Sequence, residues 1–449
     1  MKTLFSVTTA IVMFLTAGLA YGQQTSDSLL TRATLQDCIQ YALSHQPVVR
    51  QSQIDETITE HSIKSKLADW YPQIGLDYNL QHYLELPTSL FPDANGVRRP
   101  VQIGVSNTSA ALFTLNQNIF NRDLLLANRT ARDVRKQVRQ TTESNKIDVI
   151  SQVSKSYYDV LLSQKQMEVI EADIIRLERS LKDAYNQYQS GVVDKIDYKR
   201  ATIALNNAKA QRKSAQEQIV AKQVYLRELM GYPASATSLP LVYDTVGIES
   251  SVLMGDTSMG VSYDKRIEYQ LLETRRTLLE ADLRYNKWSF LPTLSAFINY
   301  SFNYQDDKFS KLYNQNYPSS LAGLKISLPI FQGSKRIHNI RQAEWQLRRV
   351  DYDFYALKNR INTEYSQALA AYRSNLNDYT TLKENVTVAQ DVYNLIEMQY
   401  KEGVKTYLDV IISQTDLRSA QLNYFNAMYQ VLSSKIDLQK AQGSLTANY

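Results

Sequence analysis

Glycine and proline are scarce in this chain. Its 449 residues include 14 glycines and 10 prolines, and in a helix interior glycine costs roughly 1 kcal/mol and proline roughly 3 kcal/mol relative to alanine. Their scarcity over such a length therefore predicts long helices. Cysteine is almost missing as well, because Cys38 is the only one, and this excludes an intrachain disulfide. We expect Cys38 to be a small buried residue on a helix.

A strong charge bias and long apolar runs are also missing. The formal net charge is +5, and the basic residues are spread along the chain, which argues against a dedicated nucleic-acid surface. After the N-terminus, no stretch approaches the ~20 apolar residues that a membrane-spanning helix requires. We therefore expect a folded chain without a helical membrane span.

The N-terminus has the three parts of a secretory signal peptide. The segment MKTLFSVTTAIVMFLTAGLAYGQQ begins with a lysine, continues with an apolar run and ends in small residues. Cleavage after Ala20 and cleavage after Gly22 both fit, and we predict a signal peptide over 1–22. The alternative is a membrane-anchoring helix, but the apolar run is short and interrupted by threonines. No cysteine stands at the cleavage site, so a lipid-anchored N-terminus is not indicated.

A short turn sequence occurs twice, 212 residues apart. YQSGVVDKIDY (188–198) and YKEGVKTYLDV (400–410) both contain Tyr, two residues, Gly, Val, four residues and Asp. Two earlier pairs recur in the same order, namely WYPQIGLDYNL (70–80) with FLPTLSAFINY (290–300), and LNQNIFN (115–121) with ISLPIFQ (326–332). Ordered recurrence of three landmarks indicates a tandem duplication.

Each half repeats the same order of elements. A helix without glycine or proline leads to a strand pair, and a helix of sixty-odd residues, ~100 Å long, then leads to the glycine turn and a return helix. The turns are therefore the tips of long helical hairpins. The predicted boundaries are a first repeat over 23–230 (strands about 73–86 and 102–120, helical hairpin about 123–230), an inter-repeat linker over 231–260, and a second repeat over 261–449 (strands about 293–304 and 321–331, helical hairpin about 334–442).

Apolar and polar residues alternate in the predicted strands. After Pro72 and Pro292 the apolar positions are Ile74, Leu76, Tyr78, Leu80, Leu294, Ile298 and Tyr300, and the return strands add Phe113, Leu115, Leu324 and Ile326. Such alternation over about ten residues is a weak signature of a membrane-spanning β-strand, and a half-buried hairpin of a soluble sheet is the alternative. Four strands cannot close a barrel, and an open edge in lipid would leave backbone groups unsatisfied. Either the hairpins are soluble or several chains pool their strands, and three chains would give twelve.

Apolar residues also form seams along the helices. Residues 379–400 alternate apolar spacings of three and four, as in a coiled coil. In 150–188 one apolar line (Ile150, Val153, Tyr157, Val160) is accompanied by a second (Tyr158, Leu161, Leu162). A helix that is apolar on two lines has neighbours on both sides, which fits the wall of a tube but also the core of a simple bundle.

Taken together, the signal peptide, the duplicated strand pairs with their NIFN and PIFQ ends, and the twin glycine tips resemble the TolC-type outer-membrane efflux protein family over essentially the whole mature chain. The resemblance implies a mainly α fold with a membrane β-barrel. Three chains would form a twelve-stranded barrel in the outer membrane, continued by an α-helical tunnel in the periplasm, with an equatorial band from the linker and both termini. The implied function is a passive exit duct for small molecules, without cofactors, served by a periplasmic adaptor and an inner-membrane pump.

The same resemblance implies roles for the tips. Tyr400 would hydrogen-bond to Asp197, Lys405 stands where the family typically has arginine, and Asp409 would form an acidic constriction ring. Adaptor docking would use the two glycines and the valines that follow them, Gly191, Val192, Gly403 and Val404. A second acidic ring of better-known members would fall on Ile412, and lysine lacks the bidentate fork of arginine, so we expect a weaker cation-binding constriction and a looser gate.

The tips also have a purely structural explanation. Gly191 and Gly403 would end a helix in the left-handed region. Asp194 with Asp197, and Thr406 with Asp409, have the spacing of a capping box, in which the N-cap and third helical residues bond each other's backbone N–H. Capping and gating are compatible roles.

Catalytic and metal-binding patterns are not found. The four histidines share no metal-ligand spacing, and there is no phosphate-binding loop or nucleophile elbow, so we expect no enzyme. The basic residues between 129 and 139 are most simply a solvated helix face. Two rivals remain, a type I protein-secretion duct and, in a different class, a periplasmic coiled-coil scaffold or adaptor without a pore. A scaffold would be extracted with aqueous buffer, whereas a barrel needs detergent.

Overall fold

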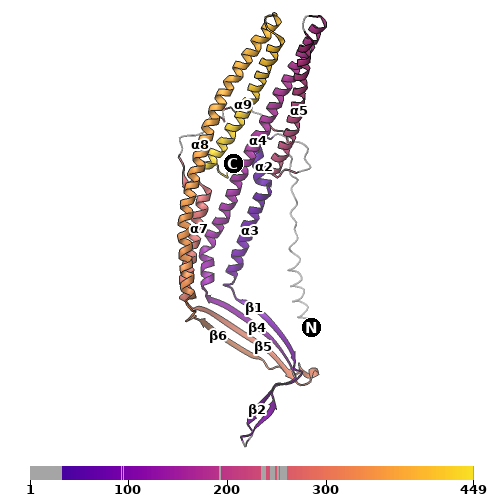
Figure 1. The fold of residues 1–449 in the computed structure, drawn as a ribbon. Coiled ribbons are helices and arrows are strands. Elements are labelled where there is room, and N and C mark those ends of the chain that lie inside the picture. The colour runs from indigo at the N-terminus through magenta and orange to yellow at the C-terminus, as the bar shows by residue number, and fades with distance from the viewer. Residues whose placement is uncertain are drawn as a thin grey trace.

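The computed structural model describes residues 33–447, apart from 93, 95, 192–193, 234–238, 243–247, 250–251 and 253–259. The predicted signal peptide, Val192 and much of the predicted linker lie outside the described residues. Figure 1 shows an elongated molecule with helices along most of its length, the two hairpin tips at one end and the strands at the other.

Two long helical hairpins dominate the structure. The first pairs α4 (Arg122–Gln189) with α5 (Lys195–Met230), and the second pairs α8 (Lys335–Lys401) with α9 (Tyr407–Gln442). With 68 residues, α4 is about 100 Å long. Within the described residues, no helix is both long enough and apolar enough to cross a membrane.

Shorter helices complete a wall at the strand end. Helix α3 (Pro47–Ala68) packs on α4, α7 (Ile267–Lys287) packs on α4 and α8, and α2 (Leu35–His45) lies against α4 and α5. The order across the wall is therefore α3, α4, α7, α8. Three short 3-10 turns, η1 (Tyr263–Lys265), η2 (Trp288–Phe290) and η3 (Phe309–Lys311), occur near the ends of α7 and after β5.

The four long strands form one antiparallel sheet with β1 and β6 at its edges. Its order is β1 (Gln73–His82), β4 (Asn107–Phe120), β5 (Thr293–Asp306) and β6 (Ser319–Ser327), so each repeat supplies two neighbouring strands. An additional small hairpin of β2 (Thr88–Pro92) and β3 (Arg98–Gln102) was not predicted; it interrupts the connection between β1 and β4, and β4 consequently begins later than expected. Strand β6 ends before Pro329, which has no backbone N–H to donate.

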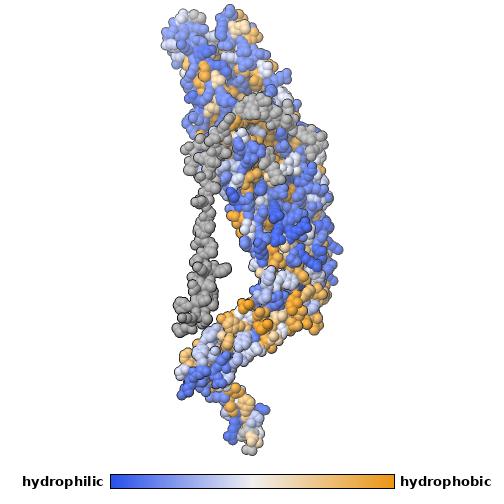
Figure 2. All heavy atoms as spheres, turned by 180° about the vertical axis from the view of Figure 1, so that it is seen from behind, coloured by the Kyte–Doolittle hydropathy of each residue, from blue (hydrophilic) through white to orange (hydrophobic). Residues whose placement is uncertain are grey.

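The register places the apolar side chains on one face of the sheet. Leu76 is opposite Phe113, which is opposite Tyr300, and Leu115 is opposite Ile298. Directly opposed residues share a face, so the alternation of the four strands is in phase. Leu76, Ile298, Leu324 and Ile326 are each more than half exposed. Figure 2 shows hydrophobic atoms gathered where the sheet meets the helices.

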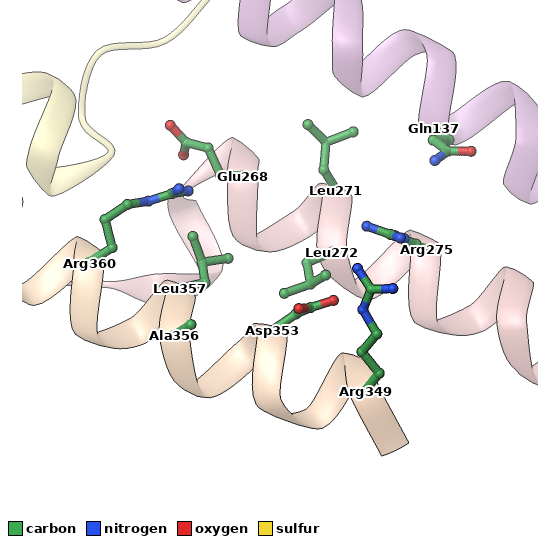
Figure 3. A pocket seen from close by; sticks show the side chains of 10 residues that line it. All are labelled: Gln137, Glu268, Leu271, Leu272, Arg275, Arg349, Asp353, Ala356, Leu357 and Arg360. Atoms are coloured by element: carbon green, nitrogen blue, oxygen red, sulfur yellow. The ribbon is translucent and has the colours of Figure 1, made fainter. Parts of the chain in front are cut away.

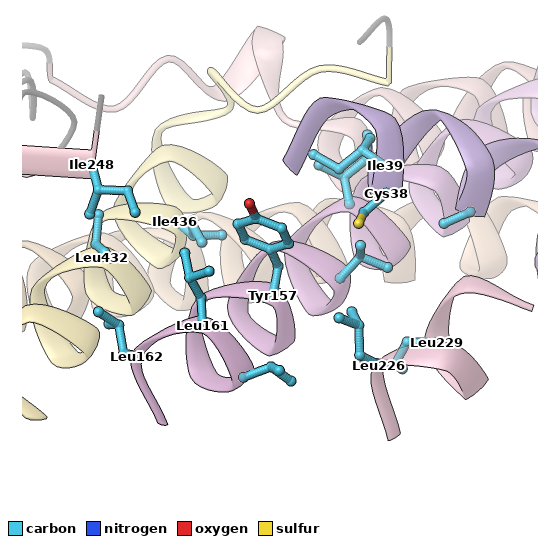
Figure 4. Packing of buried hydrophobic residues seen from close by; sticks show 14 of the residues in the cluster. Cys38, Ile39, Tyr157, Leu161, Leu162, Leu226, Leu229, Ile248, Leu432 and Ile436 are labelled. Atoms are coloured by element: carbon cyan, nitrogen blue, oxygen red, sulfur yellow. The ribbon is translucent and has the colours of Figure 1, made fainter. Parts of the chain in front are cut away.

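The main core lies midway along the molecule, where α2 and parts of the inter-repeat segment pack on the long helices (Figure 4). The Tyr157 hydroxyl donates to Val242 O at 2.7 Å, and the Tyr372 hydroxyl donates to Val252 O at 3.0 Å, so both repeats hold this segment. Cys38 is fully buried here, as predicted, and burial raises the pKa of its thiol to about 12. Both predicted seams are buried or half-buried along their length.

Two glycines end the return helices in equivalent ways. Gly231 ends α5 at φ 65°, and Gly443, 212 residues later, ends α9 at φ 72°. Each lies against the chain just before a shorter helix of its own repeat, Gly231 before α3 and Gly443 before α7. A Cβ on Gly231 would be 2.6 Å from His45 O, and one on Gly443 would be 3.1 Å from the Lys265 backbone.

Gly231→Ala is expected to destabilise the protein more than Gly191→Ala. Both positions have positive φ, which costs a residue with a Cβ about 1–2 kcal/mol. Gly191 has open space around it, whereas Gly231 would also force a clash with backbone. Thermal unfolding followed by helical circular dichroism in detergent measures the difference, and equal losses of melting temperature would contradict the close-contact role of Gly231.

Candidate gate at the hairpin tips

Both hairpin tips are built around a glycine with left-handed backbone. Gly191 (φ 74°) lies two residues after the end of α4, and Gly403 (φ 75°) lies two residues after the end of α8. Their N–H groups donate to Tyr188 O and Tyr400 O, both at 3.0 Å. The structural role predicted for the two glycines is thereby confirmed. Val404, beside Gly403, is 72% exposed.

The two return helices begin with different caps. At α9 the predicted capping box is present: Asp409 N donates to Thr406 Oγ1 at 3.3 Å, and Thr406 N donates to Asp409 Oδ2 at 2.9 Å. At α5 the predicted box is wrong, because the Asp194 side chain accepts from Ile196 N, at 3.2 Å, and not from Asp197 N, and the Asp197 side chain does not reach back to Asp194 N. A threonine hydroxyl can also donate to the acid at the third position, as it does here at 2.8 Å, whereas two carboxylates repel each other.

Tyr407 joins all four long helices near the tips. Its side chain is 3% exposed and packs with Ala184 of α4 and Ala201 of α5, while Tyr400 of α8 lies against it with ring centroids 6.0 Å apart. The two alanines leave room for the tyrosine ring. Burial raises the pKa of the Tyr407 hydroxyl, so the phenol is neutral at physiological pH.

The predicted hydrogen bond between Tyr400 and Asp197 is not formed. The Tyr400 hydroxyl donates instead to Gln187 Oε1 at 2.9 Å. The ring is held against Tyr407, so its hydroxyl reaches α4, which carries Gln187, and not the first turn of α5, which carries Asp197. Burial raises the pKa of Tyr400, and the neighbouring carboxylates of Asp183 and Asp197 act in the same direction.

Asp409 lies beside the packed stripe of α9 and is half-buried. The buried positions at this end are Tyr407, Val410, Ser413, Gln414 and Leu417. Asp409 and Ile412 lie outside this stripe, and Ile412, on the far side of the helix, is 51% exposed. The hydrogen bonds from Thr406 lower the pKa of Asp409, and the exposed Lys405 contributes. The stabilisation from this cap is fully present at a pH above the ordinary aspartate pKa of about 4. It is lost as the pH falls through the lowered pKa of Asp409.

A buried charge cluster below the tips was not predicted. Asp173 of α4 is 2% exposed, and its carboxylate accepts from Gln414 Nε2 at 2.8 Å and from Arg418 at 3.3 Å, both on α9. Arg176 adds an ion pair at 3.6 Å. The sequence gives no signal for this cluster, because Asp173 is one acidic residue among many on a long helix.

Further polar links continue from this cluster along the contact between α4 and α9. Gln166 donates to Asn426 at 2.7 Å, Lys155 pairs with Asp437, and Lys440 pairs with Asp148 at 2.6 Å. The contact between the two hairpins below the tips is thus held partly by polar groups.

The sequence profile described as outer membrane efflux protein matches residues 38–232 and 270–444, which include both hairpins and all the strands of the sheet. The chain belongs to this family. Within the efflux family, it is 23% identical to the outer membrane protein TolC of Escherichia coli over 445 residues, covering 93% of this chain and 84% of that protein.

Other members of the efflux family are similar over shorter stretches. The solvent efflux pump outer membrane protein SrpC of Pseudomonas putida is 25% identical, covering 68% of this chain and 64% of that protein. The alkaline protease secretion protein AprF of Pseudomonas aeruginosa is 21% identical, covering 66% and 62%.

Solved channel structures share the fold of this efflux-family chain. The structure of CusC superposes with a TM-score of 0.73 at 16% identity, covering 94% of this chain and 95% of that one. The Campylobacter jejuni CmeC outer membrane channel gives a TM-score of 0.71 at 14% identity, covering 95% and 91%. The predicted fold class is thereby confirmed.

Asp173→Ala is expected to loosen the contact between the hairpins. It leaves Arg418 and Arg176 without their buried partner, and breaking a buried ion pair costs about 3 kcal/mol. The expected result is a lower melting temperature and faster proteolysis near the tips. Asp416→Ala, on the exposed side of α9, is the matched control, and equal effects of the two substitutions would contradict the role of the cluster.

Proposed function

We propose that three copies of this chain form a tunnel through which small molecules leave the cell across the outer membrane. The observation that carries this proposal is the sheet. It has one apolar face that runs in register over all four strands, and its two edge strands, β1 and β6, are unpaired on their outer sides among the described residues. Pairing β1 of one protomer with β6 of the next closes a twelve-stranded barrel and leaves no free edge in lipid.

The helices continue the barrel into the periplasm. In this arrangement a water-filled passage runs from the strands to the tips. Helices α3, α4, α7 and α8 surround it near the strands, and the two hairpins surround it near the tips. A periplasmic adaptor contacts the tips at Gly191, Val192, Gly403 and Val404, and an inner-membrane pump supplies the energy. The chain itself performs no chemical step and acts as a passive duct.

Asp409 is proposed to narrow the entrance. Its place outside the packed stripe of α9 supports this, since a threefold axis would bring three copies of this surface together. Asp197, Tyr400 and Lys405 flank it, with Tyr400 acting through Gln187. Ile412, about one turn further along α9, adds no charge to the constriction, so the constriction has a single acidic ring.

Placement of the sheet in lipid is tested by a pair of neighbouring substitutions on β5. Ile298→Arg puts a charge on the apolar face and is expected to cost about 2–4 kcal/mol at the middle of the bilayer, which prevents assembly into detergent-extracted trimers. Asn299→Arg puts the same charge on the opposite face and is expected to leave assembly intact. Assembly is measured by gel filtration and membrane fractionation. A chain that extracts in aqueous buffer, with both variants behaving alike, would support the scaffold alternative instead.

Capping and gating by Asp409 are separated by two substitutions. Asp409→Asn keeps an oxygen for Thr406 N but removes the charge, so cation selectivity in a planar bilayer is expected to fall. Thr406→Ala removes about 1 kcal/mol of capping but keeps the charge, so selectivity is expected to persist. If the pore forms but only Thr406→Ala changes its properties, Asp409 is a cap alone.

A protein-secretion duct is a second candidate, because the chain also resembles AprF. Deletion of the gene distinguishes the two cargoes. Efflux predicts higher intracellular accumulation of a dye such as ethidium, and secretion predicts loss of a protein from the culture medium without a change in dye accumulation.

A further inference from the structure

A groove of about 540 Å³ lies between α7 and α8, with Gln137 of α4 at its side. Figure 3 shows Arg275 of α7 and Arg349 of α8 with their guanidinium groups turned toward one another over this groove. Leu271, Leu272 and Leu357 supply apolar surface beside them. Two cationic groups from neighbouring helices thus converge next to an apolar floor.

The positive charge of this groove is only partly neutralised. Its other charges have partners, because Glu268 pairs with Arg266 at 3.0 Å and Arg360 pairs with Glu364 at 3.6 Å. In the part of the chain that the structure describes, neither Arg275 nor Arg349 forms an ion pair, and Asp353 in the same groove pairs with neither of them. Two unpaired guanidinium groups therefore face one unpaired carboxylate.

The groove opens on the side of the wall away from the inter-repeat segment. On α8, Lys358 lies 5.7 Å from the centre of the Tyr263 ring, and Tyr263 comes directly after the inter-repeat segment. Arg360 is two residues from Lys358, and two residues turn a helix by about 200°, so Arg360 lies on the opposite side. Arg349 and Asp353 share that side, since they line the same groove. In the proposed trimer the inter-repeat segment is outside, and the groove therefore faces the passage.

We propose that this groove is a binding subsite for amphipathic organic anions on the tunnel wall. A carboxylate, sulfonate or phosphate would lie between the two guanidinium groups, whose planar donors match such oxygens, and the attached ring or chain would cover the three leucines. The threefold axis would repeat the subsite three times at one level. This inference rests on the proposed tunnel and adds a substrate class to it.

The test uses 1-naphthalenesulfonate as a blocker of the purified channel in a planar bilayer. We expect the sulfonate to reduce the wild-type conductance, while neutral 1-naphthalenemethanol does so more weakly. In the double variant Arg275→Gln, Arg349→Gln the sulfonate is expected to bind at least about tenfold more weakly, because two charge-assisted hydrogen-bond partners are lost. Asp353→Asn removes the one opposing charge and is expected to strengthen the block.

The matched control is Arg276→Gln, Arg348→Gln. It removes the same charge from the same two helices, but Arg276 pairs with Glu280 and Asp351, and Arg348 stacks on Trp345, so neither is part of the groove. Its block is expected to match that of the wild type. Equal block in both double variants would overturn the subsite while leaving the tunnel. A wild-type protein that forms no pore would overturn the tunnel and the subsite with it.

Discussion

Backbone hydrogen bonding at the sheet edges is the constraint on which the rest of this structure depends. Among the residues that the structure describes, strands β1 and β6 each have one side without a partner in the sheet. In water such groups bond to solvent, but in lipid each one costs several kcal/mol. A single chain therefore cannot place this four-stranded sheet in lipid without leaving backbone groups unsatisfied. This cost favours a closed assembly in which β6 of one copy pairs with β1 of the next.

In the proposed assembly, closure of the strands into a barrel also determines how the helices are arranged. Each strand pair is joined directly to a long helix, since β4 ends at Phe120 and α4 begins at Arg122. A ring of strands consequently imposes a ring of helices, and each helix needs neighbours on two sides. The duplication meets this need within one chain, because both repeats supply the same parts in the same order. Gly231 and Gly443 show how closely the copies correspond, since each ends a return helix against the start of a short one.

The features that could be predicted from the sequence are those with local or periodic causes. Alternation of apolar and polar residues predicted the strands, and apolar spacings of three and four predicted the helix seams. The turn glycines and the Thr406 cap could be predicted from the backbone geometry that they favour. The hydrogen bond of Tyr400 was predicted wrongly because its partner depends on how the Tyr407 ring fits beside Ala184, which no local pattern encodes. The β2–β3 hairpin was missed for a related reason: it is short, carries Pro92 and Pro100 within its strands, and lacks clear alternation.

Polar links between the hairpins have a physical consequence for motion. Apolar seams resist separation over their whole length, because any gap exposes surface to water. Hydrogen bonds and ion pairs such as those of Asp173 and Gln166 exchange with water at a smaller net cost once the contact is open. The polar links between α4 and α9 near the tips are thus easier to open than the apolar core that joins the same two helices midway along the molecule. Any separation of the two hairpins at the tips also has to remove Tyr407 from its position between Ala184 and Ala201, so aromatic packing adds to the free-energy cost of opening this end of the molecule.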